Sequence, residues 1–206
     1  GTYVLLLALH DPLAVAEEAA AVDILSDGRL DLGIGAGPMP QECEVFGVAK
    51  AETFARTYEA LGLLQRLYTE EEVTHEGKYY RYHKVRLRPK PVQRPHPPIW
   101  MAAMGPQSIE RAAQRGYHLA SALHSPLWKT YPDLLAKHGR ARRDHRIVSG
   151  PVCVHVAPTR EQAWDEAEAP LHWGVEFYRR RGVNMPLPPV GELRRTKNAG
   201  IYGVPF

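Results

Sequence analysis

The sequence predicts an α/β fold built on a parallel β-sheet. Short apolar segments of strand length alternate with longer segments of helical periodicity. A β-α-β unit is complete within residues 2–35, and glycines crowd the end of its second strand. Regular alternation of this kind is typical both of an eight-fold barrel and of an open doubly wound sheet, so both architectures remain open at this point.

The β-α-β unit begins with a near-continuous apolar run over residues 2–9, which is typical of a parallel strand buried on both faces. Asp11 and Pro12 then form a helix start, because aspartate caps the first N–H groups and proline fits the first helical position. The helix is expected to end near Leu25, and the second strand to cover residues 30–35. Strands joined through a helix in this way pair in parallel.

The segment from Gly28 to Gly37 places glycines at every second position as the second strand ends. Without a Cβ the backbone can approach a ligand closely, and ligands bind at the carboxyl ends of parallel strands. A dinucleotide site would need the spacing G-x-G-x-x-G at the start of a helix. Here the spacing is G-x-G-x-G and Pro38 and Pro40 follow, so we expect no helix start and disfavour a Rossmann site. A glycine-rich turn without a ligand is the other alternative.

A loop over residues 38–50 and a helix over 51–68 are expected next. Residues 73–98 interrupt the alternation: short β-like pieces flank a turn at Glu76-Gly77-Lys78, and five prolines then force an extended path. We interpret residues 73–98 as a surface insertion within a single domain that spans residues 1–206. A proline-rich ligand for another protein is the alternative.

Three further buried strands are expected, at residues 99–103, 117–122 and 151–157. Each is followed by an expected helix, at residues 107–115, 131–142 and 160–180. Thr159 caps the last of these helices, and Pro170 is a candidate interruption within it.

The composition bounds the function. The net charge is +3, from 26 basic and 23 acidic residues, which does not favour a nucleic-acid partner. The basic cluster Arg179–Arg181, with further basic residues at 194, 195 and 197, lacks interleaved aromatic residues. We therefore interpret it as a solvated face or an anion patch; binding of an anionic partner through this basic tail is a separate functional alternative.

Cysteine usage and hydropathy favour a cytoplasmic protein. Cys43 and Cys153 are far apart in the chain, so neither a disulfide framework nor a metal site is expected. The sequence has no apolar run of the roughly 18 residues that a membrane span needs, and we expect no membrane partner. The chain starts with Gly1, directly in an expected strand, and we expect it to be a piece of a longer protein.

Several motifs then point to one family by their order and spacing. They are Gly1–Leu7 leading into His10-Asp11-Pro12, Val15–Ala20, Ser26–Gly35, Phe46-Gly47-Val48, and Arg88–Gln93 leading through Pro97–Trp100 to Ala102-Ala103. Together they resemble the bacterial luciferase-like monooxygenase family. The resemblance covers residues 1 to about 122 and is thin after about residue 160.

The resemblance implies a (β/α)8 TIM-barrel type of fold, here incomplete with about five to six strands. Two strands of the family, with a catalytic histidine, would precede Gly1, and the eighth strand would follow Phe206. It implies an enzyme that uses reduced FMN and O2 to oxygenate a small organic substrate, with a flavin reductase as partner and a homodimer as the expected oligomer. The alternatives are an F420-dependent oxidoreductase that transfers a hydride, and a non-catalytic flavin-binding relative.

The resemblance also implies a cofactor site at the carboxyl ends of the strands. The segment Thr2, Tyr3 and Val4 would pass alongside the flavin ring, with a cis peptide bond at Tyr3–Val4. Residues near the cofactor phosphate would be Gly35, Ala36, Gly37, Met104, Gly105, Gln107, Ser108 and Arg111. Luciferases place an arginine where Ala36 stands, and Pro38 lacks an N–H, which makes F420 or another flavin binding mode more plausible.

The expected helix start at Gln107 and Ser108 suits an anion independently of the resemblance, because its N–H groups are unpaired and its dipole end is positive. A plain helix cap is the alternative. His10 and His124 follow expected strands on the same face and are candidate acid–base residues, whereas surface or cap roles are the alternative for both.

Overall fold

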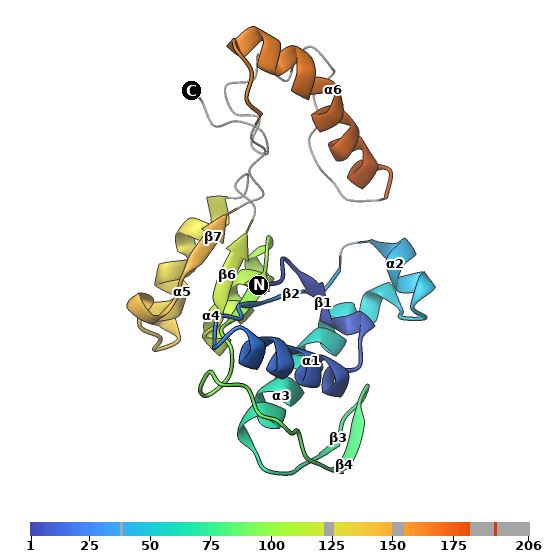
Figure 1. The fold of residues 1–206 in the computed structure, drawn as a ribbon, viewed down its shortest axis with the longest axis vertical. Helices are drawn as coiled ribbons and strands as arrows, with labels where there is room; N and C mark the ends of the chain where they lie inside the picture. The colour runs from blue at the N-terminus through green and yellow to red at the C-terminus, as the bar shows by residue number, and fades with distance from the viewer. Residues whose placement is uncertain (38, 122–125, 150–154, 182–191, 193–206) are drawn as a thin grey trace.

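The computed structural model describes residues 1–37, 39–121, 126–149, 155–181 and 192. Its main sheet has five strands in the order β1-β2-β5-β6-β7, and every neighbouring pair is parallel (Figure 1). The strands are β1 (Leu5–Leu6), β2 (Leu32–Gly35), β5 (Ile99–Ala102), β6 (His118–Ser121) and β7 (Ile147–Ser149). The predicted parallel α/β fold is therefore confirmed.

Six α-helices accompany the sheet in the described residues: α1 (Pro12–Leu25), α2 (Pro40–Val45), α3 (Thr53–Thr69), α4 (Pro106–Arg115), α5 (Tyr131–Lys137) and α6 (Arg160–Arg179). Short 3-10 turns lie at Leu7–Leu9, Lys50–Glu52, Pro126–Thr130 and Arg142–Asp144. In Figure 1, α1 and α3 lie below β1 and β2, α5 lies beside β7, and α6 stands apart from the sheet.

The core forms between the sheet and the helices that follow its strands. Leu32, Ile34 and Met101 of the sheet belong to one buried cluster with Leu64 of α3 and Ile109 of α4. Along β2 and β5 these side chains occupy alternate positions, so the residues between them point to the opposite face of the sheet. Burial of large apolar side chains on one face explains why the helices cover that face.

The first and last expected strands differ from the structure. Only Leu5–Leu6 of the apolar run is a strand, and Leu7–Leu9 turns into a 3-10 helix that buries Leu7. An apolar run reports burial and does not distinguish a strand from a turn. β7, at Ile147–Ser149, was not expected, and its Ile147 pairs with Leu119 of β6. The last strand was expected at 151–157. Residues 155–157 have no regular structure, and 151–154 lie outside the described residues.

Three helix predictions also need correction. Residues 40–45 form α2 where a loop was expected, because Pro40 occupies the first helical turn, where its missing N–H is not needed. The helix expected to reach residue 142 ends at Lys137, since Gly139 adopts a φ of +68° just beyond its cap. α6 runs through Pro170 without interruption.

The predicted turn at Glu76-Gly77-Lys78 joins an antiparallel hairpin of β3 (Val73–Glu76) and β4 (Arg81–Val85). Glu59 of α3 holds this turn: its carboxylate accepts the N–H groups of Tyr79 and Tyr80 at 3.1 and 3.0 Å. A Cβ at Gly77 would lie 2.0 Å from Glu59 Oε1, so only glycine allows the turn to pass so close to the carboxylate.

Asp23 and Gln93 attach the proline-rich segment to α1. The Asp23 carboxylate is fully buried and accepts the backbone N–H of Gln93 at 2.9 Å and its Nε2 at 2.7 Å. Gln93 Nε2 also donates to the carbonyl of Leu30 at 2.7 Å. Because a buried carboxylate is costly without donors, this pair holds the segment against the end of α1 and the start of β2.

A polar network joins the amino ends of three strands. Trp100 Nε1 donates to Asp31 Oδ1 at 2.9 Å, and the Trp100 ring lies 4.6 Å from the ring of His118. His118 Nδ1 accepts the backbone N–H of Arg146 at 3.1 Å, which ties β6 to the start of β7. Burial, with added repulsion from His145 and Arg146, lowers the pKa of His118, although Asp31 opposes the shift.

Substituting Gln93→Ala should destabilise the protein by about 2 kcal/mol, because the Asp23 carboxylate stays buried after it loses a donor. Urea denaturation at neutral pH measures this change. Gln114→Ala is the matched control, since Gln114 lies on the exposed side of α4 and should cost much less. Equal losses in the two variants would contradict the role assigned to Asp23 and Gln93.

Acidification below the ordinary histidine pKa of 6.5 should destabilise the protein through His118. The folded state lowers the pKa of His118, so the unfolded chain takes up the proton first as the pH falls, and stability decreases. His118→Asn keeps an acceptor for the Arg146 N–H but does not titrate. Urea midpoints measured at neutral and at mildly acidic pH should therefore differ less in this variant.

The matched control is His83→Asn, on the exposed side of β4, which should keep the pH dependence of the unmodified protein. An undiminished loss of stability in His118→Asn would show that other groups cause the acid sensitivity.

Candidate functional site

The carboxyl ends of β1, β2 and β5 lie side by side at one edge of the sheet. Leu6 pairs with Gly35, and Ile34 pairs with Met101, so the segments that leave β2 and β5 start at the same level. Ligands bind at this edge in parallel α/β folds. The structure thus brings together the regions around Val4, Gly35 and Met104, which are far apart in the sequence.

Gly33 and Gly35 are needed for the packing of the chain itself. A Cβ at Gly33 would lie 2.1 Å from the carbonyl oxygen of Thr2, and one at Gly35 would lie 2.6 Å from Val4 Cγ2. Gly37 adopts a φ of +76°, and its nearest neighbour is the side chain of Leu6. The close approach predicted from these glycines is made, at the first two positions, by residues 2–4 of the same chain.

Thr2 fixes the first segment to β2 with a hydroxyl that both donates and accepts a hydrogen bond. Its hydroxyl donates to the carbonyl of Gly33 at 2.8 Å and accepts the N–H of Gly33 at 3.0 Å. The expected cis peptide bond between Tyr3 and Val4 is present. Tyr3 itself is 59% exposed.

The start of α4 has the predicted form. Gly105 is the N-cap, Pro106 is the first helical residue, and Gly116 ends the helix with a φ of +69°. The Ser108 hydroxyl donates to the carbonyl of Gly105 at 2.8 Å and accepts its N–H at 3.2 Å. Ser108 therefore acts as a helix cap in this structure. The backbone N–H groups of Gln107 and Ser108 lie in the first turn of α4, where the helix has no carbonyl to accept them.

Arg111 lies against α3, one turn beyond the start of α4. Its guanidinium carbon is 5.6 Å from the centroid of the Tyr58 ring, and that of Arg115 is 4.6 Å from the same ring. Burial raises the pKa of Tyr58, and the two guanidinium groups partly offset that shift. To meet a phosphate at the start of α4, the Arg111 side chain would have to leave Tyr58.

Of the two candidate acid–base residues, only His10 lies in the described part of the chain. His10 is exposed after the first 3-10 turn, and its ring lies 6.1 Å from that of Phe46. His124 lies outside the described residues, as do Pro38 and Cys153. Ala36 is half-buried at the end of β2.

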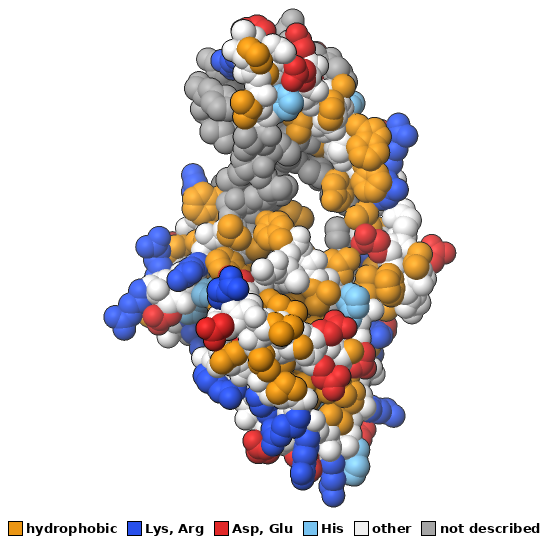
Figure 2. Space-filling model, in the orientation of Figure 1, with side chains coloured by type: hydrophobic (Ala, Val, Ile, Leu, Met, Phe, Trp, Pro, Cys, Tyr) orange, Lys and Arg blue, Asp and Glu red, His pale blue; other side chains and the backbone are white. Residues whose placement is uncertain are grey.

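Apolar side chains are exposed next to this edge. Figure 2 shows hydrophobic side chains on the surface around α2, and Val45 and Phe46 are 82% and 56% exposed. Met104, at the end of β5, is 51% exposed. Exposed apolar groups beside the ends of strands are typical of a surface that binds an organic ligand.

Lys50 is a residue of this edge that the sequence analysis missed. Its Nζ donates to the carbonyl of Gly37 at 2.5 Å and lies 5.9 Å from the centroid of the Phe54 ring. The sequence places Lys50 in a polar stretch before α3, where nothing links it to the glycines of β2. Only its spacing of four residues from Phe54 could have indicated the contact with that ring.

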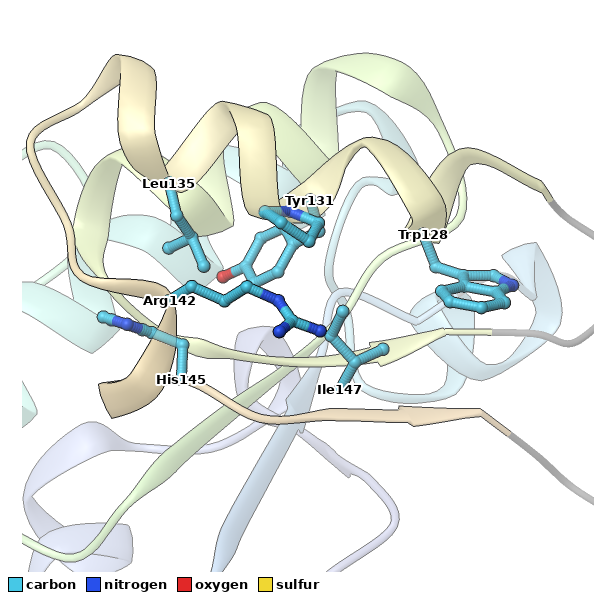
Figure 3. A pocket seen from close by; sticks show the side chains of 7 residues that line it. Trp128, Tyr131, Leu135, Arg142, His145 and Ile147 are labelled. Atoms are coloured by element: carbon cyan, nitrogen blue, oxygen red, sulfur yellow. The ribbon is translucent and has the colours of Figure 1, made fainter.

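Two cavities of about 430 Å³ each lie away from the carboxyl edge. One lies at the outer flank of the sheet, where Arg142 lies beside Tyr131, with His145 and Trp128 at opposite ends of the view (Figure 3). The other lies at the amino ends of the strands and is lined by residues that include Asp31, His118 and Arg146. Neither cavity is lined by a predicted site residue, and neither lies at the carboxyl ends of the strands.

The other candidate features are structural where they are described. Arg179 and Arg180 both pair with Glu176 of α6, at 3.3 and 3.0 Å. Within the described residues no group of three or more His, Cys, Asp or Glu side chains could hold a metal ion. None of the described helices combines the length and the apolar character that crossing a bilayer requires.

Comparison with known proteins identifies the family. The chain is 34% identical over 215 residues to 4-hydroxyprotoasukamycin monooxygenase of Streptomyces nodosus subsp. asukaensis, which covers 97% of this chain and 56% of that protein. It is 36% identical over 118 residues to the oxygenase component of flavin-dependent trigonelline monooxygenase of Acinetobacter baylyi, covering 56% of this chain and 32% of that protein.

An F420-dependent relative is similar at a comparable level. F420-dependent glucose-6-phosphate dehydrogenase of Kineococcus radiotolerans is 40% identical over 120 residues, which cover 56% of this chain and 35% of that protein. The chain thus spans about half of the length of the first of these relatives and about a third of the other two.

The fold is also similar to that of a solved monooxygenase structure. The monooxygenase RslO1 of Streptomyces bottropensis superimposes with a TM-score of 0.73 at 29% identity, over 87% of this chain and 55% of that one. The five parallel strands are accordingly part of a TIM-barrel type of fold, as the resemblance implied. The model of the luciferase-like monooxygenases matches residues 1–197, and the chain belongs to that family.

Proposed function

We propose that this chain is part of the oxygenase of a two-component flavin-dependent monooxygenase. Reduced FMN would come from a separate flavin reductase, and a small organic molecule would be oxygenated with O2. The observation that carries the proposal is the meeting of three strand ends with the start of α4 at one edge, in a chain of this family. The relatives named as a monooxygenase and as an oxygenase component support it.

The residues of the edge fit a phosphorylated flavin. The N–H groups of Gln107 and Ser108 and the positive end of α4 suit a phosphate, with Met104 and Gly105 leading into that turn. Gly35 allows Val4 to pack closely against β2, and in this proposal Ala36 and Gly37, just beyond the strand, face the cofactor. Thr2, Tyr3 and Val4 run alongside β2, and in this proposal the planar ring lies next to this segment, with the exposed Tyr3 beside it. In this proposal Arg111 adds positive charge once it has left Tyr58.

The bound flavin would activate O2. The chain would bind and orient the flavin and the substrate, and would shield the reaction from water. The exposed apolar side chains of Tyr3, Phe46 and Met104 would cover the reacting region and exclude water from it. His10, beside Phe46, and His124 remain candidates for moving a proton to or from the substrate.

Hydride transfer with F420 is the second candidate function. The F420-dependent glucose-6-phosphate dehydrogenase supports it, because its identity to this chain is similar to that of the monooxygenases. The same edge would serve, since F420 also carries a planar ring and a phosphate. Three further predictions are untested. They are a single domain over residues 1–206 with an insertion at 73–98, a homodimer, and a cytoplasmic location.

Titration of the intact protein with FMN and with F420 tests the choice of cofactor. Fluorescence quenching should show saturable binding of one of them, with FMN favoured by the proposal. Tight binding of F420 without FMN would replace the monooxygenase by the second candidate. Failure of both cofactors to bind, oxidised or reduced, would reject the proposed function.

Substituting Ser108→Ala should weaken binding of the preferred cofactor by about tenfold, the effect expected when one charge-assisted hydrogen bond is lost. Ser26→Ala at the end of α1 is the matched control and should leave the affinity unchanged, because Ser26 has similar bonds to nearby backbone but lies before the amino end of β2, away from the carboxyl edge. Equal affinities in the two variants would remove Ser108 from the proposed phosphate site.

A further inference from the structure

Two cations lie along one stripe of α3 at the carboxyl edge. The Lys50 ammonium lies over Phe54 and the Arg111 guanidinium lies over Tyr58, at 5.9 and 5.6 Å from the ring centroids. Phe54 and Tyr58 are four residues apart in a helix, so they share a face and their Cα atoms are separated by about 6 Å along the axis. The two positive groups therefore flank the same short stretch of the edge.

The position of Lys50 relative to the strands is equally specific. Gly37, whose carbonyl accepts the ammonium, lies two residues beyond the end of β2. The nearest atoms to the position of a Cβ at Gly37 belong to the Leu6 side chain, at 3.5 Å, so Gly37 lies beside the end of β1. Lys50 thus places a positive charge at the carboxyl ends of β1 and β2.

The charge on Lys50 lacks a counter-ion in the described part of the chain. No carboxylate there lies within 4.0 Å of its Nζ, and nearby Glu52 approaches Arg56 and Lys78 instead. Its side chain is half-buried, and its hydrogen-bond partner is a neutral carbonyl. A partly desolvated ammonium of this kind gains from an anion that completes its surroundings.

Resting on the proposed function, we propose that Lys50 binds the phosphate of the cofactor, with the Gly37 carbonyl holding its ammonium at the end of β2. The recognised group is a phosphate ester, which is a monoester in FMN and a diester in F420. Arg111, over the Tyr58 ring, lies about one helical turn farther along α3. The sequence assigned the phosphate to glycines and to the start of α4, whereas this proposal adds a cation from the segment that precedes α3.

The test compares a flavin with and without its phosphate. In the intact protein, Lys50→Gln should weaken binding of FMN by about tenfold, the loss expected for one charged contact, and leave riboflavin within about twofold. The corresponding pair, if F420 is the preferred cofactor, is F420 and its deazaflavin core without the phosphate. Lys50→Arg should retain most of the affinity for the phosphorylated ligand.

Lys84→Gln is the matched control, because Lys84 lies on the exposed hairpin strand β4 and should change neither affinity. Unmodified protein gives a second readout that needs no variant. Added salt should weaken binding of FMN more than that of riboflavin, since screening acts on the charged contact.

An equal loss of FMN and riboflavin in Lys50→Gln would assign Lys50 a purely structural role and overturn the proposal. Unchanged FMN affinity, or equal salt dependence of the two ligands in the unmodified protein, would do the same. If the unmodified protein binds neither FMN nor F420, the proposed function itself fails, and the role of Lys50 fails with it.

Discussion

Close packing of residues 2–4 against β2 is the constraint on which the carboxyl edge depends. Thr2 exchanges two hydrogen bonds with the backbone of Gly33, and the Val4 side chain occupies the space that a Cβ at Gly35 would need. A larger residue at either glycine would push the first segment away from β2. The segment then continues into β1 and the turn that buries Leu7, so its placement also orders the core beneath the edge.

The two edges of the sheet differ in chemistry. At the amino edge, Asp31, Trp100 and His118 are joined by hydrogen bonds and ring contacts that satisfy polar groups within the chain. At the carboxyl edge, apolar side chains such as Phe46 and Met104 are exposed, and the half-buried Lys50 has a neutral carbonyl as its hydrogen-bond partner. The amino edge therefore contributes to stability, whereas the carboxyl edge is suited to a ligand that is both planar and anionic.

Local signals predicted those parts of the fold where backbone chemistry decides the structure. Asp11 and Pro12 start α1, with the Asp11 carboxylate accepting two N–H groups, and Gly116 ends α4 in a left-handed conformation. β7 could not be predicted in this way, because three residues are too few for a periodic pattern and the strand is defined by its pairing with β6. Lys50 was missed for the same reason, since its contact with Gly37 exists only after the chain has folded.

A crystal structure of the intact protein with its preferred cofactor bound is the most direct test of the account. Electron density for the phosphate should lie at the carboxyl edge of the sheet, within hydrogen-bonding distance of the first N–H groups of α4, with the ring beside Tyr3 and Val4. Density for the cofactor at the amino edge, or on the outer flank beside Trp128 and Tyr131, would contradict the account.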